Sequence, residues 1–147
     1  MKTQGFTLHQ VLNYRREMEK VRHQEFNAAK LELEQAEKHL QREMERSERA
    51  RQELQHKQQH GIDASELQLY SDFGRRQQAT ITQQKQVVSY LDQEVEVRRE
   101  SLIDAAKEKK VLEKFKDRQN LALSNELAAK ERAFLDELSI QKAGQNP

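Results

Sequence analysis

The chain has 147 residues, of which 35% are apolar and 35% charged, with four glycines, one proline and no cysteine. An ordinary globular domain is about 45–50% apolar, so this composition excludes a thick core and favours a few long helices packed along narrow seams. The net charge of +1 gives no general attraction to nucleic acid, and no apolar run is long enough to span a membrane. The lack of cysteine excludes disulfides. We therefore expect a dissolved cytoplasmic protein.

The first predicted helix runs from about residue 8 to residue 60. Thr7 is its expected N-cap, and Gln10, three residues further on, would close a capping box. Phe6 and Val11 occupy the two positions of a hydrophobic staple around this start. The inward-facing positions of this helix are expected at Val11, Tyr14, Met18, Arg22, Phe26, Ala29, Leu33, Ala36, Leu40, Met44, Ser47, Arg51 and Leu54.

A turn is predicted at residues 61–63. Gly61 is the kind of residue that ends a helix in the left-handed conformation. Asp63 is the expected N-cap of the next helix, with Glu66 at the third helical position of a capping box. The chain should therefore reverse its direction here.

The second predicted helix runs from about residue 64 to residue 142, and Gly144 is expected to stop it. Its apolar residues recur in alternating steps of three and four, which is the coiled-coil repeat. The seam comprises Ile81, Gln84, Val88, Leu91, Val95, Arg98, Leu102, Ala105, Lys109 and Leu112.

The two predicted helices should pair as an antiparallel hairpin. In a hairpin centred on Gly61, the numbers of facing residues should add to about 122, and apolar residues of the two seams meet on this basis. The expected pairs are Leu54 with Leu67, Leu40 with Ile81, Leu33 with Val88 and Phe26 with Val95. The sequence thus predicts an all-α, antiparallel coiled-coil hairpin forming one domain over residues 1–147.

The second helix is longer than the first, so residues 115–143 should have no partner within the chain. At 1.5 Å per residue this overhang extends for roughly 43 Å. A polar helix in water has no use for many apolar residues, and we expect another chain or a second copy to cover them. They are Leu121, Leu123, Leu127, Phe134, Leu135, Leu138 and Ile140.

Three polar features admit a functional and a structural interpretation. His56 and His60 could both reach one metal ion, but two ligands do not make a site, and solvated residues at a helix end are favoured. The basic segment 107–118 is interrupted by acids and lacks interleaved aromatic residues, so a solvated face or a contact with an acidic protein is favoured over nucleic acid. Arg98, in the seam near Glu25, is expected to fix the register.

The aromatic residues that open the second helix are the most ambiguous candidates. Tyr70 and Phe73 either fill the end of the hairpin or begin a stripe with Gln77, Thr80 and Gln84 that faces a partner. No nucleophile, general base and oxyanion donor can be assembled, and there is no glycine-rich phosphate loop. The sequence therefore predicts a protein-binding coiled coil with no enzymatic activity and no cofactor.

Several local strings resemble the FliJ family of flagellar type III export proteins. The most specific is the lysine-rich segment at residues 105–118, with its Leu-Glu pair at Leu112 and Glu113. The other matching segments are residues 6–12, the pair Tyr70 and Phe73, residues 130–131 and residues 135–137. The resemblance covers nearly the whole chain.

The resemblance implies a coiled coil similar to the central stalk of rotary ATPases. Such proteins insert their paired ends into the hexameric export ATPase and promote its assembly and activity. They also contact the cytoplasmic domain of the export gate membrane protein and handle export chaperones, which implies a peripheral place at the cytoplasmic face of the inner membrane.

Carried onto this sequence, the resemblance places the export-gate contact on Phe73, Gln77, Thr80 and Gln84. It places the ATPase contact on Leu8, Val11, Leu12, Lys110, Leu112, Phe115, Leu123, Leu127 and Phe134. Two other interpretations remain open, a structural coiled-coil scaffold and a cytoplasmic holdase chaperone that binds unfolded clients through the overhang.

Overall fold

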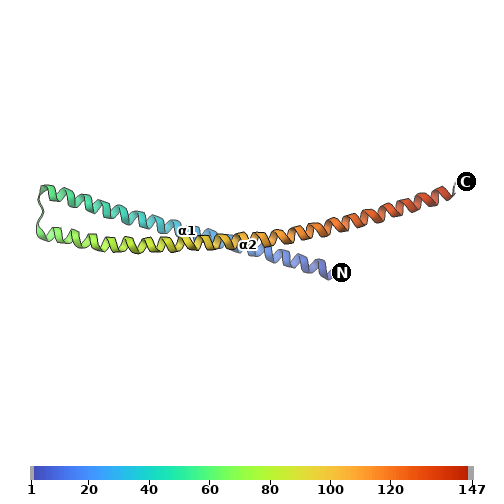
Figure 1. Ribbon diagram of the computed structural model, residues 1–147, viewed down its shortest axis with the longest axis horizontal. Helices are drawn as coiled ribbons and strands as arrows, with labels where there is room; N and C mark the ends of the chain where they lie inside the picture. The colour runs from blue at the N-terminus through green and yellow to red at the C-terminus, as the bar shows by residue number, and fades with distance from the viewer. Residues whose placement is uncertain (1, 146–147) are drawn as a thin grey trace. The chain divides into compact units, whose positions relative to one another are not determined.

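The computed structural model describes the backbone of residues 2–145 and the side chains of residues 7–144. It consists of two long helices packed against each other, α1 (Lys2–His60) and α2 (Ala64–Gln145), with no strand among the described residues (Figure 1). The all-α helical hairpin predicted from the sequence is confirmed.

Two helix ends differ from the prediction. α1 begins at Lys2, so Thr7 lies inside the helix and does not cap it. Gly5 is the only strong helix breaker in residues 2–7, and one glycine does not stop the helix there. The predicted staple involves Phe6, whose side chain lies outside the described ones. At the other end, α2 continues through Gly144 to Gln145.

The turn between the helices has the predicted chemistry. Gly61 has a φ of 97°, in the left-handed region that favours glycine. The Asp63 carboxylate accepts a hydrogen bond from the Glu66 backbone N–H at 2.9 Å, which confirms the N-cap. The Glu66 side chain forms an ion pair across the hairpin with Lys57 at 3.1 Å and does not close a capping box.

The chain forms two compact units, and each helix contributes to both. The hairpin unit (Lys20–Ile103) contains the turn, and α1 and α2 run antiparallel within it (Figure 1). The terminal unit comprises Met1–Glu19 and Asp104–Pro147. That the chain is a single domain stays a prediction.

Polar contacts fix the register of the hairpin unit close to the predicted one. The Gln77 side-chain amide donates to the Glu43 carbonyl at 3.0 Å, and Arg98 forms an ion pair with Glu25 at 3.5 Å. The apolar core of this unit is thin, because only Ala36, Ile81 and Val95 are buried. All ten predicted seam positions of α2 are buried or half-buried in their respective units, which confirms the α2 seam.

The terminal unit is organised around Leu12, which is 0% exposed, and Ala105, which is 7% exposed. Three ion pairs surround this small core. They are Lys109–Glu19 at 2.6 Å, Arg16–Glu113 at 3.8 Å and Arg15–Glu108.

The predicted seam is wrong at the start of α1. Val11 and Tyr14 are 38% and 58% exposed, and the adjacent Leu12 takes the inward position. The buried or half-buried residues alternate in steps of three and four back from Arg22, through Glu19, Arg15, Leu12 and Leu8. Charged residues that pair with α2 therefore occupy the seam, whereas the sequence reading selected apolar residues on a neighbouring face.

The predicted seam also fails near the turn. Leu67, Met44 and Arg51 are exposed, so the expected pair of Leu54 with Leu67 does not form a buried contact. Tyr70 and Phe73 are half-buried instead, because their large rings already occupy the space between the helices at this end.

Candidate functional site

The overhang is an uncovered surface of the terminal unit, and its continuous exposed stretch begins at residue 117, two residues later than predicted, because Lys116 is half-buried. Every described residue from 117 to 144 is exposed. Its large apolar residues remain in contact with water, with Leu123 56% and Phe134 61% exposed. A run of exposed apolar side chains on one helix marks an interaction surface more strongly than scattered ones do.

The structure divides the nine predicted ATPase-contact residues. Leu12 is fully buried and contributes to the fold of the terminal unit. Leu8 and Leu112 are half-buried. The six that are exposed are Val11, Lys110, Phe115, Leu123, Leu127 and Phe134. The role of all nine in ATPase binding stays a prediction.

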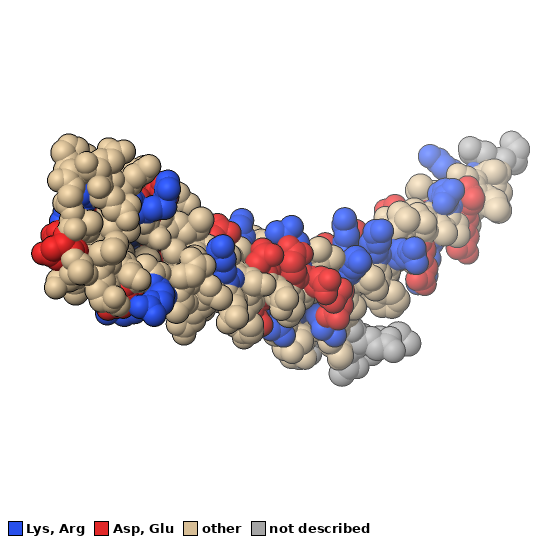
Figure 2. Space-filling model, turned by 60° about the vertical axis from the view of Figure 1, so that its left-hand side comes forward, with Lys and Arg blue, Asp and Glu red and all other residues tan. Residues whose placement is uncertain are grey.

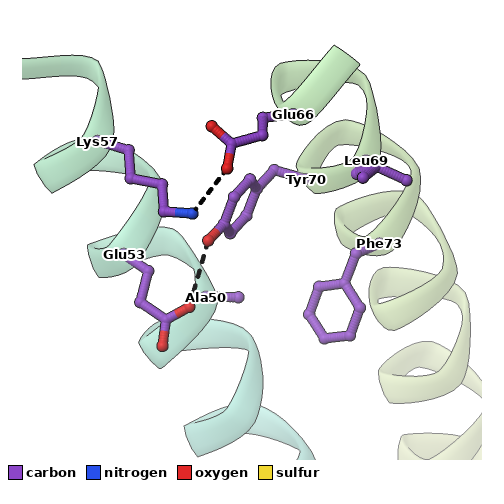
Figure 3. Close-up of a pocket in the computed structure, with 7 residues that line it drawn as sticks. All are labelled: Ala50, Glu53, Lys57, Glu66, Leu69, Tyr70 and Phe73. Carbon is purple, nitrogen blue, oxygen red and sulfur yellow. Dashed lines mark hydrogen bonds and ion pairs between the residues drawn. The ribbon is translucent and has the colours of Figure 1, made fainter. Parts of the chain in front are cut away.

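A second candidate surface lies at the turn end of the hairpin unit, where the helices enclose a hollow of about 390 Å³. Figure 3 shows Tyr70 directed from α2 toward α1, with Phe73 one turn further along. The Tyr70 hydroxyl donates to the Glu53 carboxylate at 3.4 Å, and Lys57 lies over the Tyr70 ring. The sequence reading missed Glu53, Lys57 and Glu66 as a group, because only the pairing of two helices brings them together.

Gaps between the helices at this end have a simple cause. A second hollow, of about 230 Å³, is lined by Ser47 and Gly74 together with both rings. Small residues on each helix face each other there, and the rings of Tyr70 and Phe73 keep the space from closing. The turn end is therefore loosely packed and offers partly exposed aromatic surface.

The four predicted gate-contact residues do not share one exposed face. Gln77 is buried and donates to the Glu43 backbone and carboxylate, while Gln84 is half-buried and donates to the Ala36 carbonyl at 3.2 Å. Both glutamines thus serve the pairing of α1 and α2 directly. Thr80 is exposed, with its hydroxyl bonded to the Arg76 carbonyl, and Phe73 is half-buried beneath Arg46. Their gate-binding role stays a prediction.

The electrostatics of both units are local. A hydrogen bond to Glu66, and a weaker one to Tyr70, raises the pKa of Lys57 above its ordinary value. In the terminal unit the hydrogen bond to Glu19 raises the pKa of Lys109 in the same way. Figure 2 shows acidic and basic side chains intermixed on the visible face, so neither unit presents a surface of one sign there.

The structure shows the contacts of the two remaining candidates from the sequence, the histidine pair and Arg98. The rings of His56 and His60 stack with centroids 4.4 Å apart, and His60 Nδ1 lies 3.0 Å from the His56 carbonyl. Within the described residues, no group of three or more potential ligands could hold a metal ion. Arg98 pairs with Glu25 and Glu94, as its register-fixing role requires.

What the described surfaces offer is contact area. The hollows at the turn end are open grooves between α1 and α2, and a further hollow, of about 450 Å³, lies along the overhang beside Leu135 and Leu138. Within residues 2–145, neither helix has a stretch long and apolar enough to cross a membrane. The overhang and the turn end are thus candidate protein-binding surfaces.

The family described as flagellar FliJ protein matches residues 4–147, nearly the whole chain. The comparisons with curated proteins and with solved structures gave no match.

Proposed function

The chain belongs to the FliJ family and is a flagellar export-related protein, and from this premise we propose that it is the stalk-like coiled coil of the hexameric export ATPase. In this role it has no enzymatic activity of its own. It binds the ATPase, promotes assembly of the hexamer and raises its rate of ATP hydrolysis.

One observation carries this proposal: the overhang presents a series of large apolar side chains to water. Each would contribute roughly 1.5–3 kcal/mol if a partner covered it fully. Leu123, Leu127 and Phe134 are all exposed, and their spacings of four and seven residues put them on one side of the helix, so a partner could cover all three at once. The start of α1 belongs to the same unit, which places Val11 and Phe115 among the exposed residues near the base of the overhang.

We further propose that the turn end of the hairpin unit contacts the cytoplasmic domain of the export gate. Phe73 and Thr80 are the members of the predicted set with surface available to a partner, and the exposed part of the half-buried Tyr70 ring adds to it. Gln77 and Gln84 would support this surface indirectly by holding α2 on α1. Export chaperones are further partners of this kind, and the protein would work at the cytoplasmic face of the inner membrane without entering it.

Titration of the purified export ATPase with this protein tests the main proposal. Hexamer formation, followed by mass in solution, and ATP hydrolysis should both rise to a plateau, while the protein alone hydrolyses nothing. Unchanged hydrolysis at saturating protein would contradict the stalk role. Suppression of the aggregation of unfolded clients without any effect on the ATPase would favour the holdase, and open-ended self-assembly would favour the scaffold.

A further inference from the structure

Two glutamates mark one side of the hairpin unit. A carboxylate oxygen of Glu25, on α1, lies 3.5 Å from the guanidinium of Arg98, and one of Glu94, on α2, lies 3.9 Å from it. One guanidinium reaches both carboxylates because Glu25 and Glu94 lie on the same side of the paired helices. This side is here called the acidic flank, and it comprises positions 21, 25, 28 and 32 of α1 and positions 87, 90, 94, 97 and 101 of α2.

Four exposed apolar residues lie on the acidic flank. On α1, Val21 precedes the marking glutamate by four residues and so lies one turn away on the same face. On α2, Val87, Tyr90 and Val97 lie seven and four residues before and three residues after the marking glutamate, which places them on its face. All four are exposed, Tyr90 by 62% and Val97 by 56%. The acidic flank therefore combines apolar surface from both helices.

A pair of cations marks the opposite side of the hairpin unit. Lys30 Nζ lies 5.3 Å and Arg99 Cζ lies 5.5 Å from the centroid of the Phe26 ring, so one cation from each helix reaches the same ring. Each cation follows the marking glutamate of its own helix by five residues and therefore points about 140° away from it around the helix axis. The exposed apolar residues thus lie on the side that presents carboxylates.

The α2 part of the acidic flank has the spacing of a helix–helix seam. Its positions 87, 90, 94, 97 and 101 alternate in steps of three and four, which is the coiled-coil repeat. This series runs beside the seam that α1 fills and is offset from it by one residue. From Val87 to Val97 it extends for roughly 15 Å at 1.5 Å per residue. A strip with this spacing fits the side of a third helix.

We propose that the acidic flank binds a basic amphipathic α-helix of a partner protein, which packs along α1 and α2 as a third helix. The inference goes beyond the proposed function, because the acidic flank contains none of the residues assigned above to the ATPase or the export gate. The apolar stripe of the partner helix covers Tyr90 and Val97. Its lysines or arginines lie beside the carboxylates at the edges of the stripe.

Charge determines this choice of partner. The nine positions of the acidic flank include the carboxylates of Glu25, Glu32 and Glu94 and no lysine or arginine. Arg98 belongs to the seam between α1 and α2 and is already shared by two of these carboxylates. A basic helix gains attraction to all three glutamates, whereas an acidic helix is repelled. A second copy docked through the same flank would place carboxylates against carboxylates, which disfavours a symmetric dimer.

The probe for the test is a synthetic helical peptide of about three heptads, with leucine at its seam positions and lysine beside them. A matched peptide carries glutamate in place of every lysine. The full chain has no cysteine, so a single Ser101→Cys can carry a polarity-sensitive fluorophore on the acidic flank. Ser89→Cys is the control label, because Ser89 lies five residues before Glu94 and points about 140° away from it.

The lysine peptide should shift the emission of the label at 101 and leave that at 89 unchanged. It should bind at least about tenfold more tightly than the glutamate peptide at low salt. The double variant Tyr90→Gln, Val97→Gln should weaken binding at least about tenfold, because a buried aromatic anchor carries much of the energy of an interface. Its melting temperature should stay near that of the parent, since both side chains are exposed.

A charge reversal gives a second, independent readout. Glu32→Lys should weaken binding of the lysine peptide and strengthen that of the glutamate peptide, because it changes the sign of one charge on the acidic flank. Glu37→Lys makes the same charge change five residues further on, about 140° around α1, and should have a smaller effect on both peptides.

Four results would overturn the proposal. They are equal responses of the labels at 101 and 89, equal binding of the two peptides, binding that the double variant leaves unchanged, and no binding of either peptide. A doubled mass in solution without peptide, abolished by the double variant, would assign the flank to a second copy of the chain and would also overturn the basic partner helix.

Discussion

Leu12 provides the sharpest test of how the terminal unit is held together. Its side chain is 0% exposed, and Leu→Ala at a buried site costs about 2–5 kcal/mol. A two-helix seam can partly close around the gap, so we expect the lower half of this range, about 2–3 kcal/mol. That loss corresponds to a roughly 30- to 150-fold larger population of the locally opened state.

The adjacent Val11 is the matched control. Val11 is 38% exposed, so the apolar surface lost in Val11→Ala lowers the free energy of unfolding by about 1 kcal/mol. The better helix propensity of alanine offsets roughly half of this loss. The net change should be about 0.5 kcal/mol.

Native-state hydrogen exchange measures both effects where they occur. In Leu12→Ala, backbone amides of residues 8–19 and 104–116 should exchange roughly 30- to 150-fold faster, and in Val11→Ala about twofold faster. Amides around Ile81 in the hairpin unit serve as an internal reference. Faster exchange in Val11→Ala than in Leu12→Ala would refute the observed seam and restore the one through Val11 and Tyr14.

Three further predictions follow from the contacts. Cysteines at Leu33 and Val88 should form a disulfide within one chain, and crosslinks only between chains would exclude the intramolecular hairpin. Phe73→Ala should weaken binding to the export gate while the helical circular dichroism signal is retained. If Phe73→Ala instead melts the helices, the ring belongs to the core. Gln77→Ala, by contrast, should lower the melting temperature. Because the pKa of Lys109 is raised in the folded state, its ion pair stabilises fully below the ordinary lysine value of 10.5 and is lost as pH rises through the folded value. The melting-temperature difference between wild type and Lys109→Met should therefore shrink above about pH 10.5, and a constant difference would contradict this role.

The parts of the fold that depend on local chemistry were predictable. Gly61 and Asp63 determine the turn through one left-handed residue and one side-chain cap, and both act within a few residues of themselves. The α2 seam was predictable because its apolar residues recur regularly, from Ile81 to Leu112.

The start of α1 was not predictable from periodicity alone. Its inward positions include Arg15 and Glu19, which are acceptable in a seam only because α2 supplies Glu108 and Lys109 opposite them. Inspection of one helix therefore favoured the apolar Val11 on a neighbouring face. An apolar pattern cannot reveal an interface made of charges from two segments.

The candidate surfaces were predictable to different degrees. The overhang followed from the unequal helix lengths, and its exposed apolar residues were identified correctly. Gln77 and Gln84 were read as one stripe with Phe73, but hydrogen bonds to α1 draw both glutamines inward. A glutamine in a seam can face either a partner protein or its own neighbouring helix, and its spacing in the sequence is the same in both cases.

The affinity of the export ATPase for the double variant Leu123→Asp, Phe134→Asp tests the central claim most directly. Both side chains are exposed in the free protein, so the melting temperature should stay close to that of wild type. Two carboxylates placed against an apolar surface would remove the gain from burial and add a desolvation cost, so binding should be lost. Unchanged affinity would contradict the claim that the overhang binds the ATPase, and a collapse of the melting temperature would show that these residues pack within the chain.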